Sequence, residues 1–264
     1  MRKFTFWAIA VLITLASAVY QRMTGPTYPF RGKVNIDGSD IKYGLPRSAE
    51  NVKDCEISLK IQNPDTSGFV TYKRYKTDDP WIQVPLTRKA GLLVASLPKQ
   101  PAAAKLAYKV VLRAREKEVS LAGESPVVIR FKGVVPAAVL IPHILAMFLA
   151  MLFSTRAGLA ALDQSSNPRT YVLWTIALVF IGGFILGPIV QKLSFGAFWT
   201  GFPLGLDLTD NKMLIACVGW LAALIAGQRG KPARGWVLGA SILMLVVYLI
   251  PHSLLGSELK YPAP

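Results

Sequence analysis

Long unbroken runs of apolar residues mark the second half of the chain. Four of them lie at 134–153, 171–190, 213–226 and 236–255. The first, second and fourth runs have about 20 residues, enough for an α-helix to cross the hydrocarbon core of a bilayer. The run 213–226 is shorter. Membrane-spanning β-strands would alternate apolar and polar residues, and these runs do not. The pattern therefore predicts a four-helix transmembrane domain over residues 133–264.

A further apolar run, residues 4–20, follows the basic start Met1-Arg2-Lys3. The small residues Ala16-Ser17-Ala18 resemble a signal-peptidase site, which would make the start of the chain a cleaved signal peptide. A run of about 17 mostly apolar residues is also just long enough for an uncleaved transmembrane anchor. Under both interpretations residues 1–20 export the segment that follows.

The segment 21–132 has the pattern of short β-strands. Residues 55–62 alternate apolar and polar side chains without interruption, which is the period of a half-buried strand, and Asn63-Pro64-Asp65 ends it. Turn residues recur about every 8–12 residues, as in a β-sandwich. Further strands are expected at 69–75, 81–86, 92–97, 106–114 and 127–131.

Part of this segment resembles a known domain class. The stretches Tyr72–Trp81, 97–98 and 106–112 are similar to the core of fibronectin III and related immunoglobulin-like domains. The resemblance covers about 60 residues of a class that usually has about 100. It implies an immunoglobulin-like β-sandwich in which Tyr108 packs at a corner and Trp81 is buried, and often a role in adhesion or assembly. A fold does not define a function by itself.

Composition supports the division of the chain. Only 17% of the 264 residues are charged and 52% are hydrophobic, with a mean hydropathy of +0.39, whereas soluble domains have about 25% charged residues. Residues 21–132 carry 20 Lys and Arg against 11 Asp and Glu, and residues 133–264 carry 8 against 4. The basic residues alternate with apolar ones and form no stripe with aromatic partners, which argues against nucleic acid. They favour anionic lipid headgroups, an acidic partner or a simply solvated basic surface.

The basic residues of the loops predict the topology. Loops 154–170 and 227–235 are the more basic ones, and cytoplasmic loops carry an excess of Lys and Arg. These residues are Arg156, Arg169, Arg229, Lys231 and Arg234. The N-terminus and both loops are therefore expected in the cytoplasm. Residues 21–132, loop 191–212 and the C-terminal tail are expected outside, in the periplasm, so the chain is predicted to be a multi-pass protein of the cell (inner) membrane.

His143 and His252 are the two histidines of the chain, and both follow Leu-Ile-Pro. An ionisable residue in a membrane span is a functional-site hypothesis by default, and imidazole ligates haem iron or copper. In the other interpretation each histidine forms a hydrogen bond between helices, since the preceding proline frees a carbonyl oxygen. Cys55 and Cys217 fit no metal-binding spacing.

The predicted outer loop 193–212 is aromatic, rich in glycine and unusually apolar. Trp199 and Phe202 are candidates for the lining of a pocket for a lipid or a quinone, with Asp207 and Asp210 at its mouth. The other interpretation is an interfacial anchor, since tryptophan is enriched at headgroup level. The two aspartates would then cap the following helix and interact favourably with its dipole.

No phosphate-binding loop, His-Glu-x-x-His motif, nucleophile elbow or Cys-x-x-Cys pair is present in the sequence. The sequence favours a non-enzymatic membrane protein whose exported domain binds or positions a partner protein or an envelope ligand, for example as a subunit of a membrane complex, and no cofactor is expected. The alternative is a membrane redox or metal-binding protein that holds haem or copper on His143 and His252. A transporter comes third, because the spans are few and contain no acidic residue.

Overall fold

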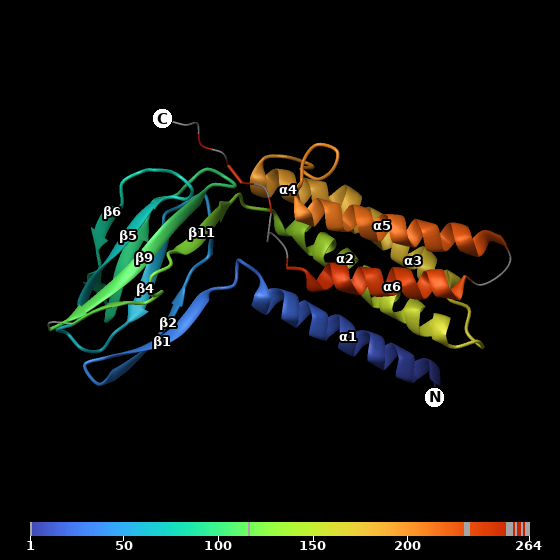
Figure 1. Cartoon of the computed structure of the whole chain (residues 1–264), viewed down its shortest axis with the longest axis horizontal. Helices are drawn as coiled ribbons and strands as arrows, with labels where there is room; N and C mark the ends of the chain where they lie inside the picture. Colours follow the sequence, from blue (N-terminus) through green and yellow to red (C-terminus); the bar gives the residue numbers. More distant parts are fainter. Residues whose placement is uncertain are drawn as a thin grey trace. The chain divides into compact units, whose positions relative to one another are not determined.

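The computed structural model describes residues 2–115, 117–229, 233–251, 256, 258, 259 and 261. The chain divides into two compact units (Figure 1). The helical unit comprises residues 1–26 and 135–257, and the sheet unit comprises residues 27–134 and 258–264. The chain is thus a mixed α and β protein, as the sequence predicts.

Short strands build the sheet unit. They are β1 (Phe30–Ile36), β2 (Ser39–Leu45), β3 (Ser48–Glu50), β4 (Cys55–Lys60), β5 (Ser67–Arg74), β6 (Ile82–Pro85), β7 (Thr87–Lys89), β8 (Leu92–Leu97), β9 (Lys105–Ala114), β10 (Lys117–Ser120) and β11 (Val127–Lys132). Within the described residues they form a β1–β2 hairpin, a three-stranded sheet of order β4-β8-β7, and a six-stranded sheet. The six-stranded sheet has the order β3-β11-β9-β5-β6, with β10 paired to β9.

Alternating side chains of the three sheets meet in one core. Leu106, Tyr108, Val110 and Leu112 point inward from β9 and are almost fully buried, together with side chains of β2, β4, β5, β8 and β11. The Tyr108 hydroxyl donates a hydrogen bond of 2.7 Å to the carbonyl oxygen of Pro46. The predicted burial of Tyr108 is therefore confirmed, while the immunoglobulin-like assignment stays a prediction.

The predicted burial of Trp81 is wrong. Trp81 is 42% exposed and directly precedes β6, which lies at the edge of the six-stranded sheet. Its ring lies 5.5 Å from Lys73 Nζ and 5.8 Å from Lys109 Nζ, two side chains that alternate outward between core residues of β5 and β9. Val84 of β6 packs against the core. Trp81 lies three positions before it, so the alternation of side chains puts the indole ring on the outer face of the sheet and not in the core.

The β1–β2 hairpin was not among the expected strands. Its turn is Asp37-Gly38, with φ of 52° and 76°, which are the two positive values of a type I′ turn. Ile36 pairs with Ser39 across this turn. An Asp-Gly pair between runs of alternating residues is a strong local hairpin signal, so the sequence did contain the information.

Most helices of the helical unit are long and apolar. They are α1 (Arg2–Thr24), α2 (Ala137–Leu162), α3 (Arg169–Val179), the π-helical segment η1 (Phe180–Leu186), α4 (Gly187–Phe195), α5 (Leu208–Ala226), the short 3-10 helix η2 (Gly227–Arg229) and α6 (Arg234–Leu249). Within the described residues, four helices are long and apolar enough to cross a membrane: α1, α2, the continuous α3-η1-α4 and α5.

All four helical runs of the C-terminal half differ in length from those expected. The first run becomes α2, which extends to Leu162, so Arg156 lies in the helix and the predicted loop 154–170 shortens to residues 163–168. The second run becomes the continuous α3-η1-α4, which ends at Phe195.

The third run of the C-terminal half becomes α5, whose 19 residues begin at Leu208 and not at Met213. The last run gives α6, whose 16 residues end at Leu249. Ile250 is extended there, because the following Pro251 restricts the residue before it and has no N–H for a further helical bond.

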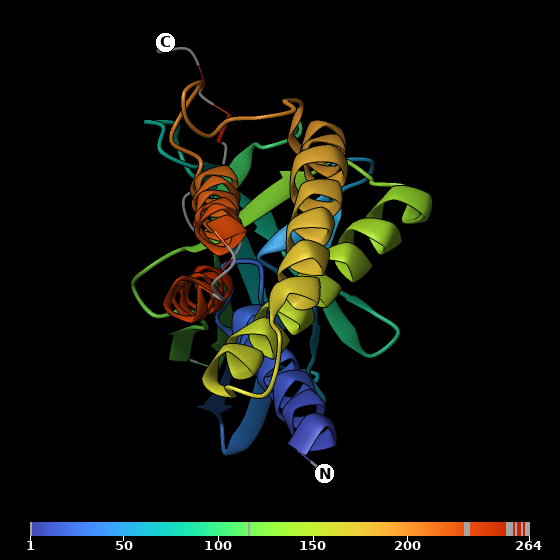
Figure 2. The ribbon, with the colours of Figure 1, turned by 90° about the vertical axis from the view of Figure 1, so that its right-hand side faces the viewer.

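The helix pairs α2–α6 and α5–α6 run in opposite directions, whereas α1 and α6 run in the same direction. Arg234 at the start of α6 bonds to carbonyl oxygens at the end of α2, and Lys212 near the start of α5 bonds to Ile250 at the end of α6. Figure 2 shows α5 and α6 nearly end on, beside the longer α3-η1-α4. The helical unit therefore has an arginine end, where α1, α3 and α6 begin, and a loop end, where α5 begins.

Candidate functional site

The predicted residues of the outer loop come together at the loop end. Asp207 caps α5 by accepting a 2.8 Å hydrogen bond from the Thr209 amide. Asp210 Oδ2 accepts hydrogen bonds from the amides of Thr200 (2.6 Å) and Gly201 (2.9 Å). Both aspartates are at least nine-tenths buried. Asp207 is thus the cap of α5, in agreement with the capping interpretation, whereas Asp210 in the first turn of α5 does not cap the helix and instead holds the loop through two of its amides.

The two aromatic residues lie differently. Trp199 stacks on Phe184 at 5.8 Å between ring centroids, and its indole N–H donates to the Phe202 carbonyl oxygen. The Phe202 side chain is 65% exposed, and Leu204 and Leu206 beside it are more exposed still. The loop thus has a polar interior and an apolar tip, and binding of a lipid or quinone there stays a prediction.

Sequence reasoning missed the buried lysine of this end. Lys212 is 4% exposed, and its Nζ donates a 2.6 Å hydrogen bond to the Ile250 carbonyl oxygen. Gln21 of α1 similarly donates to the carbonyl oxygen of Tyr248. These bonds satisfy carbonyl groups that the last turn of α6 leaves free. They connect the C-terminal end of α6 to the C-terminal end of α1 and to the N-terminal part of α5.

His143 contacts a neighbouring helix. Its Nδ1 lies 2.9 Å from the carbonyl oxygen of Gly182 in η1, which also accepts the Gly187 amide in the π-helical pattern. The partner is thus a carbonyl of the facing helix and not one that Pro142 frees. His252 lies outside the described residues. In the part of the chain that the structure describes, no three His, Cys, Asp or Glu side chains are grouped to hold a metal.

The arginine end contains a buried cation. Arg156 is 1% exposed, and its guanidinium lies 4.5 Å from the ring centroid of Tyr171 and within 6 Å of those of Phe6 and Trp7. Trp7 also makes edge-on contacts with Phe153 and Tyr171. Aromatic faces stabilise a desolvated cation by about 2 kcal/mol or more. α1 thus completes the enclosure of Arg156.

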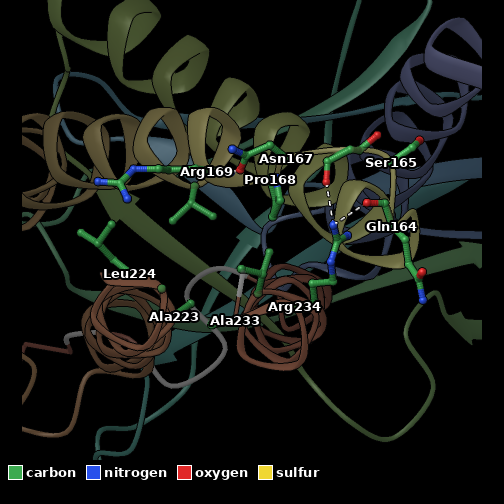
Figure 3. A pocket seen from close by; sticks show the side chains of 13 residues that line it. Gln164, Ser165, Asn167, Pro168, Arg169, Ala223, Leu224, Ala233 and Arg234 are labelled. Atoms are coloured by element: carbon green, nitrogen blue, oxygen red, sulfur yellow. Dashed lines mark hydrogen bonds between the residues drawn. The ribbon is translucent and has the colours of Figure 1, made fainter. Parts of the chain in front are cut away.

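A cavity of about 350 Å³ lies at the same end (Figure 3). The turn 164–168 and the start of α3 form one side of it, and the end of α5 and the start of α6 form the other. The Arg234 guanidinium donates to five carbonyl oxygens of the end of α2 and the following turn. This side chain therefore fixes the shape of the cavity wall.

The outer face of the six-stranded sheet is strongly basic. We call it the basic face, and it comprises Phe69, Lys73, Trp81, Lys105, Lys109 and Arg113. The Arg113 guanidinium lies 4.8 Å from the Phe69 ring centroid, and Trp81 lies between Lys73 and Lys109. Among the described residues, neither of these two lysines forms a salt bridge. Cations and exposed aromatic surface thus alternate across the strands.

The C-terminal tail occupies one end of this face. Glu258 lies 3.2 Å from both Lys76 and Lys105, and the Leu259 amide donates to the carbonyl oxygen of Ala103. Burial raises the pKa of Glu258, but its bonds to Lys105 and Lys76 more than offset this, so its pKa lies below the ordinary value. This end of the face thus accepts a carboxylate.

The sequence matches no model of a known protein family, and searches of curated proteins and of solved structures found no significant match.

Proposed function

We propose that the protein is a non-enzymatic, multi-pass protein of the cell membrane whose extracytoplasmic sheet unit binds an acidic segment of a partner protein on the basic face. The observation that carries the proposal is Trp81, which stays 42% exposed between two lysines without salt bridges among the described residues. Tryptophan flanked by cations combines a large apolar contact area with charge, and such residues contribute most to protein interfaces.

The tail supports an acidic partner. Lys105 and Lys109 stand on the same side of β9, because side chains two and four residues apart in a strand share a face. Glu258 already pairs with Lys105, whereas the surface around Lys109 is open to another carboxylate. An acidic segment would therefore extend from the site of the tail towards Trp81.

The membrane part of the proposal rests on the helices and on the course of the chain. Four helices have the length and apolarity of membrane spans. Arg156 in the last two turns of α2, Arg169 at the start of α3 and Arg234 at the start of α6 lie at the arginine end, and an excess of cations near the ends of spans supports a cytoplasmic location of this end. The chain passes from α1 into the sheet unit and from it into α2, and the tail after α6 belongs to the sheet unit. The proposed topology puts the end of α1, the start of α2 and the end of α6 on the outer side of the membrane.

Cysteine labelling tests this topology. In a background with Cys55→Ser and Cys217→Ala, Ser67→Cys should react with a membrane-impermeant maleimide in cells stripped of their outer membrane. Ser165→Cys should react only after lysis, although both serines are exposed in the structure. Labelling of Ser165→Cys in sealed cells would refute the topology.

A peptide titration tests the basic face. The full-length protein in nanodiscs should bind a fluorescent glutamate-rich peptide, and its glutamine counterpart should not bind. The double variant Lys73→Gln/Lys109→Gln should raise Kd about 2- to 30-fold, since each exposed ion pair contributes about 0.2–1 kcal/mol. Trp81→Ala should weaken binding about fivefold or more.

The matched control removes the same charge elsewhere. Lys42 and Lys60 are exposed lysines of β2 and β4, outside the basic face. Lys42→Gln/Lys60→Gln should leave Kd nearly unchanged at physiological salt, where charges farther apart than about 8 Å are largely screened. Equal losses in the two double variants would show attraction by net charge alone and would refute a specific face.

A further inference from the structure

The cavity at the arginine end has two chemically different walls (Figure 3). The turn 164–167 and Arg169 form a polar wall, and Val172, Leu224 and Val237 contribute to an apolar wall. A volume of about 350 Å³ lies within the range of ligand pockets, about 300–1,000 Å³. Because one wall is polar and the other apolar, a ligand of this cavity would be amphipathic.

The polar wall carries excess positive charge. Arg234 Nη1 and Nη2 are engaged by neutral carbonyl oxygens, the closest being that of Asp163 at 2.7 Å, so its charge is not cancelled by a carboxylate. Arg169 is exposed at the start of α3 and has no salt bridge among the described residues. The Asp163 carboxylate accepts hydrogen bonds from Ser165 and Ser166 next to it. Among the described residues, two cations thus belong to this wall, and the carboxylate next to it, that of Asp163, already has local donors.

The position of the cavity agrees with a ligand from the bilayer. Its polar wall is a turn between two apolar helices, and its apolar wall begins one helical turn inside, at Val172 of α3 and Val237 of α6. In a membrane-spanning bundle this depth corresponds to the boundary between headgroups and acyl chains. Basic pockets between transmembrane helices on the cytoplasmic side bind the headgroups of anionic lipids.

We propose that this cavity binds the phosphate headgroup of an anionic phospholipid of the surrounding leaflet. The phosphate oxygens accept hydrogen bonds from Arg169, while Arg234 adds positive potential and holds the turn in place. The glycerol end of the lipid and the first carbons of its chains lie against Val172, Leu224 and Val237. The inference rests on the membrane location proposed above and is independent of the basic face of the sheet unit.

Lipid titration of the full-length protein in mild detergent tests the site. Binding of short-chain phosphatidylglycerol and phosphatidylcholine would be counted by native mass spectrometry at about 0.15 M salt, where distant charges are screened. The wild-type protein should retain phosphatidylglycerol in preference to phosphatidylcholine. Arg169→Gln should weaken phosphatidylglycerol binding about fivefold, from about 1 kcal/mol for each basic residue near an anionic lipid.

Lys3→Gln is the matched control, because Lys3 is an exposed cation of the same end that does not line the cavity. It should change the affinity little. Equal weakening by the two substitutions, or no preference for phosphatidylglycerol in the wild type, would overturn the proposal. Displacement of the lipid by inorganic phosphate at comparable concentration would show a site for the free anion instead. The labelling of Ser165→Cys tests the membrane location separately, so the two failures are distinguishable.

Discussion

Tyr108 provides the most direct test of how the sheet unit is stabilised. Its side chain is fully buried, and its hydroxyl donates a 2.7 Å hydrogen bond to the Pro46 carbonyl oxygen. Tyr108→Phe keeps the ring but leaves this carbonyl without its partner, which should lower the free energy of unfolding by about 1–3 kcal/mol. Tyr108→Ala also removes the ring and leaves a cavity, and should cost about 3–5 kcal/mol.

The control is Tyr72, which pairs with Tyr108 across β5 and β9. The Tyr72 hydroxyl has no hydrogen bond in the described structure, so Tyr72→Phe should change stability by less than about 0.5 kcal/mol.

Hydrogen exchange of peptides from β9, measured by mass spectrometry on the full-length protein, reports the opening of this unit apart from the helices. The exchange rate of β9 amides should rise about 5- to 160-fold in Tyr108→Phe, the equivalent of about 1–3 kcal/mol. It should rise further in Tyr108→Ala. Equal exchange in Tyr108→Phe and Tyr72→Phe would refute the role of the hydrogen bond. A cost below about 1 kcal/mol for Tyr108→Ala would refute the assignment of the core.

Four further outcomes are expected. The purified protein should keep its N-terminal helix in an intact-mass measurement, and a mass that fits cleavage after Ala18 would contradict this expectation. Trp7→Ala should lower the stability by about 3–5 kcal/mol in thermal unfolding, because Trp7 covers the buried Arg156. Arg234→Lys should lower the stability by about 1.5–3 kcal/mol in the same assay, since an ammonium group cannot reach all five carbonyl oxygens that the guanidinium binds. A smaller loss of stability would argue against a structural role of these hydrogen bonds. Because the pKa of Glu258 is lowered in the docked tail, docking of the tail should persist at neutral pH and weaken as the pH falls below about 4.3. Below that pH the tail amides should lose protection from hydrogen exchange. An unchanged protection pattern would contradict the role of the carboxylate.

Local patterns in the sequence determined the elements of this protein. Uninterrupted apolar runs predicted the long helices, because a helix in lipid must present apolar side chains on all sides over a length that the bilayer sets. Strict alternation predicted β4, since neighbouring side chains of a strand point to opposite faces. Asp207 at the start of α5 was recognisable as a cap, because capping depends on residues two or three positions apart.

The tertiary structure alone decided what these elements contact. Alternation shows that Lys73 and Lys109 share a face with other outward residues, but the position of Trp81 beside them depends on the strand order, which places β6 next to β5. The ion pair between Glu258 and Lys105 joins segments far apart in the chain, and the bond between His143 and Gly182 joins two helices. Such contacts depend on how elements pack over long sequence separations, and the period of a single element carries no information about its neighbour.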